Sequence, residues 1–206
     1  MNATPESLRL SGPVGELEAA LEVPAEPSAI AVICHPHPLQ GGTMHNKVVT
    51  TLARTLQGLG HATLRFNYRG VGASAGDYGE IIGETADALA AIDWMRNRFK
   101  GLPLTLAGFS FGGVVAVRAA AQVQPARLIT VAPAVNRLPV DQSPPACPWL
   151  LVIGDADEVV EPKPVLDWAG QMTPPPAICV LPGVGHFFHG SLQKLRDAVQ
   201  DWYRTP

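Results

Sequence analysis

The segment Gly108-Phe109-Ser110-Phe111-Gly112 could present a serine as a nucleophile. An apolar run precedes it and an alanine-rich, helix-favouring stretch follows it. On a sharp turn from strand to helix, a serine hydroxyl projects clear of the backbone, and the two flanking glycines avoid collisions with neighbouring chain. The same turn points the Phe111 amide at a developing oxyanion, where the helix dipole adds positive potential. Ser110 is therefore the candidate nucleophile, and Phe111 is a candidate oxyanion-hole donor.

A second Gly-x-Ser-x-Gly motif, Gly72-Ala73-Ser74-Ala75-Gly76, lies in a different context. It follows Asn67-Tyr68-Arg69-Gly70 and runs into Asp77-Tyr78-Gly79, so no helix opens at the serine. This composition is typical of a glycine-rich loop. We therefore expect Ser74 to be a loop residue without a catalytic role.

An activated serine needs a histidine to accept its proton and a carboxylate to orient that histidine. Two later apolar runs end in such residues. The run 149–153 leads into Gly154-Asp155-Ala156-Asp157, and the run 178–181 leads into a loop that carries His186. The chain order is therefore serine, aspartate, histidine, with each residue on a loop after a predicted strand.

The acid and the base each have a neighbour of the same type. Asp155 could cap a turn while Asp157 acts as the acid, or the two roles could be reversed. His189 is an alternative base, but the glycine before His186 and the strand behind it favour His186. We expect Glu158, beside Asp157, to be a solvated loop charge.

Apolar runs and helical periodicities alternate along the chain. Strands are predicted at 15–23 (paired with 7–10), 29–34, 62–66, 104–109, 127–131, 149–153 and 177–181. Helices are predicted from an Asn46 cap to Gly60 and at 83–99, 112–123, 164–172 and 192–203. This alternation predicts a mostly parallel, doubly wound sheet, with functional groups at the carboxyl ends of its strands.

Composition narrows the class of protein. A chain of 206 residues that is 47% hydrophobic fits one domain, residues 1–206. A net charge of −3 gives no basic surface for nucleic acid or an anionic membrane. The start carries no secretory signal pattern, and no apolar run is long enough to span a membrane. Three distant cysteines fit a reducing compartment. We expect a cytoplasmic monomer or homodimer.

Four motifs together resemble those of the α/β-hydrolase superfamily, over nearly the whole chain. Gly108–Gly112 matches the nucleophile elbow, and Gly185–Phe187 looks like the terminal Gly-His-Phe. Gly154–Val160 is similar to the Gly-x-x-Asp-x-x-Val acid loop, which selects Asp157. Arg69–Ser74 is similar to the Arg-Gly-x-Gly-x-Ser loop, which accounts for the second serine motif. The resemblance implies an α/β-hydrolase fold.

More narrowly, Cys34–Val49 resembles a subgroup of small, lidless serine hydrolases. In the superfamily, the loop after this strand carries His-Gly-x, whose third residue lends the second oxyanion amide. That position is His37 in this chain. Pro36 replaces the glycine, and Pro38 has no N–H at all. The resemblance therefore implies His37 as the second donor, with Leu39 as the fallback.

The sequence His35-Pro36-His37-Pro38 contains a His-x-His pair, which often ligates metals. The two prolines stiffen the backbone, no third ligand is fixed nearby, and His45 lies on a separate turn. We expect no metal and no cofactor, so chelators should leave activity unchanged.

The expected function is hydrolysis of a small-molecule carboxylic ester or thioester through an acyl-enzyme on Ser110. Residues 132–148, where relatives insert a cap, are too few for two packed helices, so we expect no cap domain and short, soluble acyl substrates. One rival is a dienelactone-type hydrolase, which usually carries a cysteine nucleophile. Another is a non-catalytic binding protein on the same fold, although all three catalytic residue types are present.

Overall fold

Eight β-strands form one sheet in the computed structural model, which describes residues 5–140 and 145–204. The strands are β1 (Glu6–Gly12), β2 (Gly15–Glu22), β3 (Ala29–Cys34), β4 (His61–Phe66), β5 (Leu104–Phe109), β6 (Arg127–Val131), β7 (Trp149–Gly154) and β8 (Ala177–Leu181). The described helices are η1 (Pro38–Gln40, a 3-10 turn), α1 (Lys47–Gly58), α2 (Ile82–Arg98), α3 (Phe111–Val123), α4 (Pro162–Gly170) and α5 (Leu192–Arg204).

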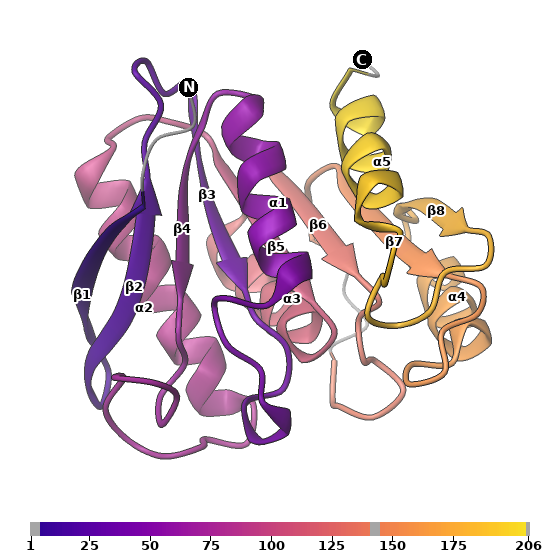
Figure 1. Cartoon of the computed structure of the whole chain (residues 1–206), viewed down its shortest axis with the longest axis horizontal. Coiled ribbons are helices and arrows are strands. Elements are labelled where there is room, and N and C mark those ends of the chain that lie inside the picture. Colours follow the sequence, from indigo (N-terminus) through magenta and orange to yellow (C-terminus); the bar gives the residue numbers. More distant parts are fainter. Residues whose placement is uncertain (1–4, 141–144, 205–206) are drawn as a thin grey trace.

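The strands lie in the order β1-β2-β4-β3-β5-β6-β7-β8. Strand β2 is antiparallel to both its neighbours, whereas every pair from β4 to β8 is parallel. Helices α1 and α5 cover one face of the sheet, and α2 and α3 cover the other (Figure 1). The sequence-based prediction of a doubly wound, mostly parallel sheet is thus confirmed.

Burial along the strands follows their position in the sheet. All six residues of β3, and likewise all of β4, β5 and β7, are buried, because helices cover both faces. Strand β8 forms the edge, where Ile178 and Val180 are 43% and 40% exposed. The predicted helix cap is also confirmed, since Asn46 Oδ1 accepts a hydrogen bond from the Val48 amide at 2.9 Å.

The connection between β6 and β7 is short. The described parts of this connection, residues 132–140 and 145–148, contain no helix, so the expected absence of a cap domain holds there. Residues 141–144 lie outside the described residues. In the described part of this connection, only loop residues lie between the carboxyl end of β6 and the start of β7.

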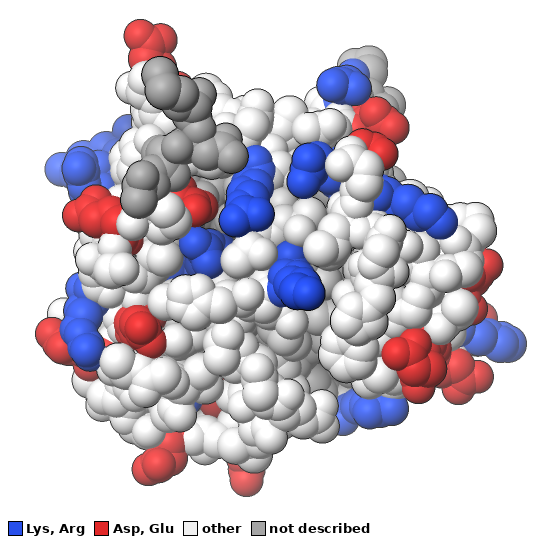
Figure 2. All heavy atoms as spheres, viewed as in Figure 1, with Lys and Arg blue, Asp and Glu red and all other residues white. Residues whose placement is uncertain are grey.

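Charge is distributed unevenly over the face that carries α1 and α5. Figure 2 shows basic side chains around the middle of this face, while its lower part is mostly uncharged. Strands β3, β4 and β6 point toward that lower part (Figure 1). Among residues 5–140 and 145–204, no helix is long and apolar enough to cross a membrane.

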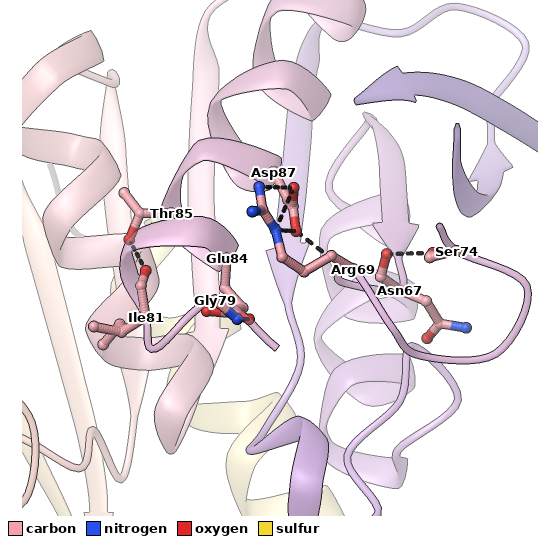
Figure 3. Close-up of polar contacts among 8 residues, drawn as sticks. All are labelled: Asn67, Arg69, Ser74, Gly79, Ile81, Glu84, Thr85 and Asp87. Atoms are coloured by element: carbon pink, nitrogen blue, oxygen red, sulfur yellow. Dashed lines mark hydrogen bonds and ion pairs between the residues drawn. The ribbon is translucent and has the colours of Figure 1, made fainter. Parts of the chain in front are cut away.

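The loop after β4 contains the second serine motif and is held by its own hydrogen bonds. Ser74 Oγ donates to the Asn67 carbonyl at 2.7 Å and accepts from the Glu18 amide at 2.9 Å. Figure 3 shows the first of these contacts. Ser74 is thus a structural residue of this loop, as its context predicts.

An ion pair anchors the same loop to α2 (Figure 3). Arg69 Nη2 lies 2.8 Å from Asp87 Oδ1, and its Nε lies 3.0 Å from Oδ2. The Arg69 backbone amide also donates to Oδ2 at 3.0 Å. The Asp87 side chain is fully buried and that of Arg69 is 11% exposed. Because a buried charge is costly without a partner, each residue depends on the other.

We predict that Asp87→Asn lowers the free energy of unfolding by about 3 kcal/mol, because it leaves the Arg69 guanidinium largely buried without a counter-charge. Urea denaturation measures this loss. The control is Asp167→Asn, which removes an exposed pair with Lys163 and should leave the free energy of unfolding essentially unchanged, because solvent screens that pair. Equal losses in the two variants would contradict the anchoring role of Asp87.

Candidate active site

Ser110 occupies a strained turn between β5 and α3. Its φ of 56° and ψ of −116° place a non-glycine residue in a conformation that L-amino acids rarely adopt. A Cβ at Gly112 would overlap the carbonyl oxygens of Cys34 and His35, and one at Gly108 would overlap the backbone of Gly112. The two glycines therefore allow the elbow to pack directly against the end of β3, as the motif predicts.

Three side chains from separate loops form one hydrogen-bonded line. Ser110 Oγ lies 3.1 Å from His186 Nε2, and His186 Nδ1 lies 2.8 Å from Asp157 Oδ2. All three residues are buried, although none is close to the others in sequence. With a proton on Nδ1 donated to Asp157, Nε2 is free to accept the proton of the serine hydroxyl.

The geometry distinguishes the two aspartates. Besides its contact with His186, Asp157 uses Oδ1 to accept hydrogen bonds from the amides of Val159, at 2.9 Å, and Val160, at 2.7 Å. Asp155 Oδ1 instead accepts from the Gly183 amide at 2.6 Å. Asp155 therefore joins the loops after β7 and β8, whereas Asp157 faces the imidazole.

His189 and Glu158, the neighbours of the candidate base and acid, lie outside the hydrogen-bonded line. His189 is exposed, and its ring contacts that of Phe187 at a centroid distance of 5.9 Å. Glu158 Oε2 accepts a hydrogen bond from the His186 backbone amide at 3.1 Å. Glu158 is exposed, as expected for a solvated loop charge, and this hydrogen bond is a contact that the sequence did not predict. Because β7 pairs with β8, the loop that carries Glu158 lies against the loop that carries His186, although the two residues are 28 positions apart in the sequence.

The loop after β3 brings His37 to the serine. The His37 ring lies 4.9 Å from that of Phe111 and 5.4 Å from that of Tyr78. Burial lowers the pKa of His37, which keeps this imidazole neutral at pH 7. Leu39 is 70% exposed, and its amide already donates to His37 Nδ1 at 3.2 Å. Phe111 begins α3, so its amide has no acceptor within the helix.

His35 is a buried bridge between two loops. Its Nδ1 donates to the Pro36 carbonyl at 2.7 Å, and its Nε2 accepts from the Tyr68 amide at 3.1 Å. Burial lowers the pKa of His35 to about 3, so the ring is neutral and both nitrogens are engaged. His35 thus offers no lone pair to a metal. Within the described residues, no group of three or more His, Cys, Asp or Glu side chains could hold one.

A pocket of about 190 Å³ opens beside Ser110. The residues that line it are His37, Gln40, Ser110, Phe111, Ala134, Arg137, Leu138, Val159 and Val160. The last five come from the loops after β6 and β7, and sequence reasoning missed them as site residues. The sequence indicated these residues as site residues only by their position after predicted parallel strands, where functional groups usually lie.

The fold is that of the α/β-hydrolase superfamily, and a serine lies at its elbow. Solved structures support this class. The chain is 43% identical to XC6422 from Xanthomonas campestris, described as an α/β serine hydrolase without a lid, over 97% of this chain and 94% of that one, with a TM-score of 0.93. It is 44% identical to an α/β serine hydrolase homologue from Coxiella burnetii, over 95% and 96%, with a TM-score of 0.89.

More particularly, residues 25–146 match the family model described as serine aminopeptidase, S33. The chain belongs to this family. It is also 31% identical to the uncharacterized protein RP471 from Rickettsia prowazekii, over 95% of this chain and 87% of that protein.

We predict that Gly112→Ala lowers the free energy of unfolding by about 3 kcal/mol, the upper end of the usual cost of overpacking, because the new methyl group meets backbone that cannot move independently. Thermal and urea unfolding measure the change. Gly58→Ala is the matched control, since a Cβ there meets open space at the end of α1. It should be neutral or stabilise by up to about 1 kcal/mol. Tolerance of alanine at position 112 would refute the proposed close approach.

Proposed function

We propose that this protein hydrolyses carboxylic esters or thioesters of small molecules through an acyl-enzyme on Ser110. The observation that carries the proposal is the buried line from Ser110 Oγ through the His186 imidazole to the Asp157 carboxylate. Nucleophile, base and orienting acid each lie within hydrogen-bond reach of the next, which is the geometry that nucleophilic catalysis requires.

In the first half-reaction, His186 Nε2 accepts the hydroxyl proton as Ser110 Oγ attacks the substrate carbonyl carbon. The carbonyl oxygen becomes an oxyanion. On collapse, the bond to the alcohol or thiol breaks, and His186 gives its proton to that leaving group. In the second half-reaction, His186 takes a proton from water, the hydroxide attacks the acyl carbon, and the acid is released as Ser110 recovers its proton. Asp157 stabilises the transient imidazolium throughout.

The amides of Phe111 and His37 are our proposed oxyanion donors. The Phe111 amide is at the start of α3, where the helix dipole also favours negative charge. His37 lines the pocket beside Ser110, whereas Leu39 does not and its amide is already bonded to His37. These contacts favour His37 over Leu39 as the second donor.

The lining of the pocket argues against aminopeptidase activity, which the family description names. An aminopeptidase must bind a free ammonium group, and a carboxylate is the natural partner for that charge. The described residues that line the pocket include no Asp or Glu, and the charged residue among them is Arg137. With a volume of about 190 Å³, the pocket fits a short acyl group better than a polypeptide.

The two rival functions lack support in the site. A dienelactone-type hydrolase would place a cysteine at the elbow, and residue 110 is a serine. The nearest candidate thiol, Cys34, lies on β3, and burial raises its pKa to about 12, so it is protonated and unreactive at neutral pH. A non-catalytic binding protein would have no need for an intact serine, histidine and aspartate line.

We predict that Ser110→Ala abolishes covalent labelling by a fluorophosphonate and lowers ester turnover by about 10⁶. The measurements are labelling followed by mass spectrometry, and kcat on 4-nitrophenyl butyrate. Ser74→Ala is the matched control, because it removes the serine of the other Gly-x-Ser-x-Gly motif while leaving the line to His186 untouched. Labelling lost in the Ser74 variant and kept in the Ser110 variant would overturn the assignment.

We predict that Asp157→Asn lowers kcat by about 10⁴, because an amide facing Nδ1 favours the imidazole tautomer that cannot accept the serine proton. Asp155→Asn makes the same chemical change in the same loop, where the carboxylate contacts Gly183 and not His186. It should retain activity within about tenfold. Steady-state kinetics of the two folded variants distinguishes them, and the reverse ranking would exclude Asp157 as the acid.

A further inference from the structure

The guanidinium group of Arg137 lies at the pocket that contains the candidate nucleophile, Ser110. Arg137, in the loop after β6, lines this pocket together with Ser110 and is itself exposed. The mechanism described above gives Arg137 no role. An arginine beside a reacting centre is a strong recognition element, because its planar cation donates hydrogen bonds in a fixed geometry.

Arg137 is held in place without being neutralised. Its Nη2 donates to the Val159 carbonyl at 2.5 Å, which fixes the guanidinium against the loop after β7. Among the described residues, no carboxylate lies within 4.0 Å of Arg137. A guanidinium has five N–H donors, so most of them remain available to a ligand.

Among the described residues that line the pocket, Arg137 is the one that carries a charge at pH 7. His37 is neutral at pH 7 because burial lowers its pKa, and the other described lining residues are uncharged. Two carboxylates of the acid loop contact His186 instead of Arg137: Asp157 contacts Nδ1, and Glu158 accepts a hydrogen bond from the backbone amide. Arg118 donates to the Pro139 carbonyl and so adds a second cation beside the same loop.

The pocket lies on the acyl side of the scissile bond. A leaving alcohol or thiol must receive its proton from His186 Nε2 and therefore departs past that ring. The described lining of the pocket includes Ser110 and Phe111 but not His186. A separate hollow of about 300 Å³, lined in part by Phe187 and His189, opens on the His186 side. The acyl chain therefore enters the pocket that contains Arg137.

We infer that Arg137 determines acyl specificity by pairing with a carboxylate at the far end of a short acyl chain. Since a water-sized group takes about 30 Å³, a pocket of about 190 Å³ holds about six such groups. Leu138, Val159 and Val160 supply apolar walls for the methylene groups between the ester and the carboxylate. The preferred substrates are thus half-esters or half-thioesters of short dicarboxylic acids. This inference rests on the proposed esterase function.

The experiment compares kcat/KM for mono-4-nitrophenyl glutarate and 4-nitrophenyl hexanoate, which differ chiefly in the terminal carboxylate. Rates are corrected for spontaneous hydrolysis with the Ser110→Ala variant. In wild type, the glutarate ester is expected to be preferred, and the preference should weaken as salt rises. Arg137→Gln should lower the ratio of the two kcat/KM values about tenfold, the effect of one charge-assisted hydrogen bond.

Two control variants separate recognition from structure. Arg137→Lys keeps the charge and should retain part of the preference. Arg96→Gln removes an exposed arginine whose Nη2 also donates to a valine carbonyl, that of Val123, and it should leave the ratio unchanged.

The outcomes distinguish this inference from the function on which it rests. If Arg137→Gln lowers kcat/KM equally for both esters, Arg137 only supports the loop after β7 structurally, and the inference is overturned. The inference is also wrong if wild type hydrolyses both esters in a Ser110-dependent way but prefers hexanoate. Failure of wild type to hydrolyse either ester or to react with a fluorophosphonate would overturn the esterase function itself.

Discussion

The close approach of the α3 N-terminus to the end of β3 is the contact on which the rest of the site depends. Gly112 lies where any side chain would overlap the carbonyl oxygens of Cys34 and His35. This approach brings the elbow serine, the Phe111 amide and the loop of His37 into one small volume. Since the backbones of two central parallel strands set the distance, the position of the nucleophile is as rigid as the sheet itself.

Polar contacts then join the loops that carry the site. His35 joins the loops after β3 and β4, Asp155 joins those after β7 and β8, and Arg69 ties the loop after β4 to α2 through Asp87. The buried contacts of His35 and of the Arg69–Asp87 pair would be costly to leave half-made, so the loops that they join have little freedom to separate. Such preorganisation is what electrostatic stabilisation of an oxyanion requires, because the donors need not reorient during the reaction.

The short β6–β7 connection leaves loops to form the walls of the pocket beside Ser110. In the described residues no cap covers the pocket, so its walls come from the loops after β6 and β7 and from the His37 turn. A lidless pocket of this size offers little apolar surface for a long chain, and a single well-placed charge can then contribute much of the selectivity. Arg137, held by the Val159 carbonyl, is in a position to supply that charge.

Local patterns in the sequence determined the alternation of strands and helices, the Asn46 cap and the strand-to-helix elbow at Ser110, because each depends on residues within one or two turns. The choice of Asp157 over Asp155 came from a family resemblance, and the geometry that separates them appears only where loops 29 residues apart meet. Likewise, Glu158 and Arg137 carry no local signal of their contacts with His186 and Val159. The parallel pairing of β5, β6, β7 and β8 determines these contacts, because it brings loops that are distant in sequence to one edge of the sheet.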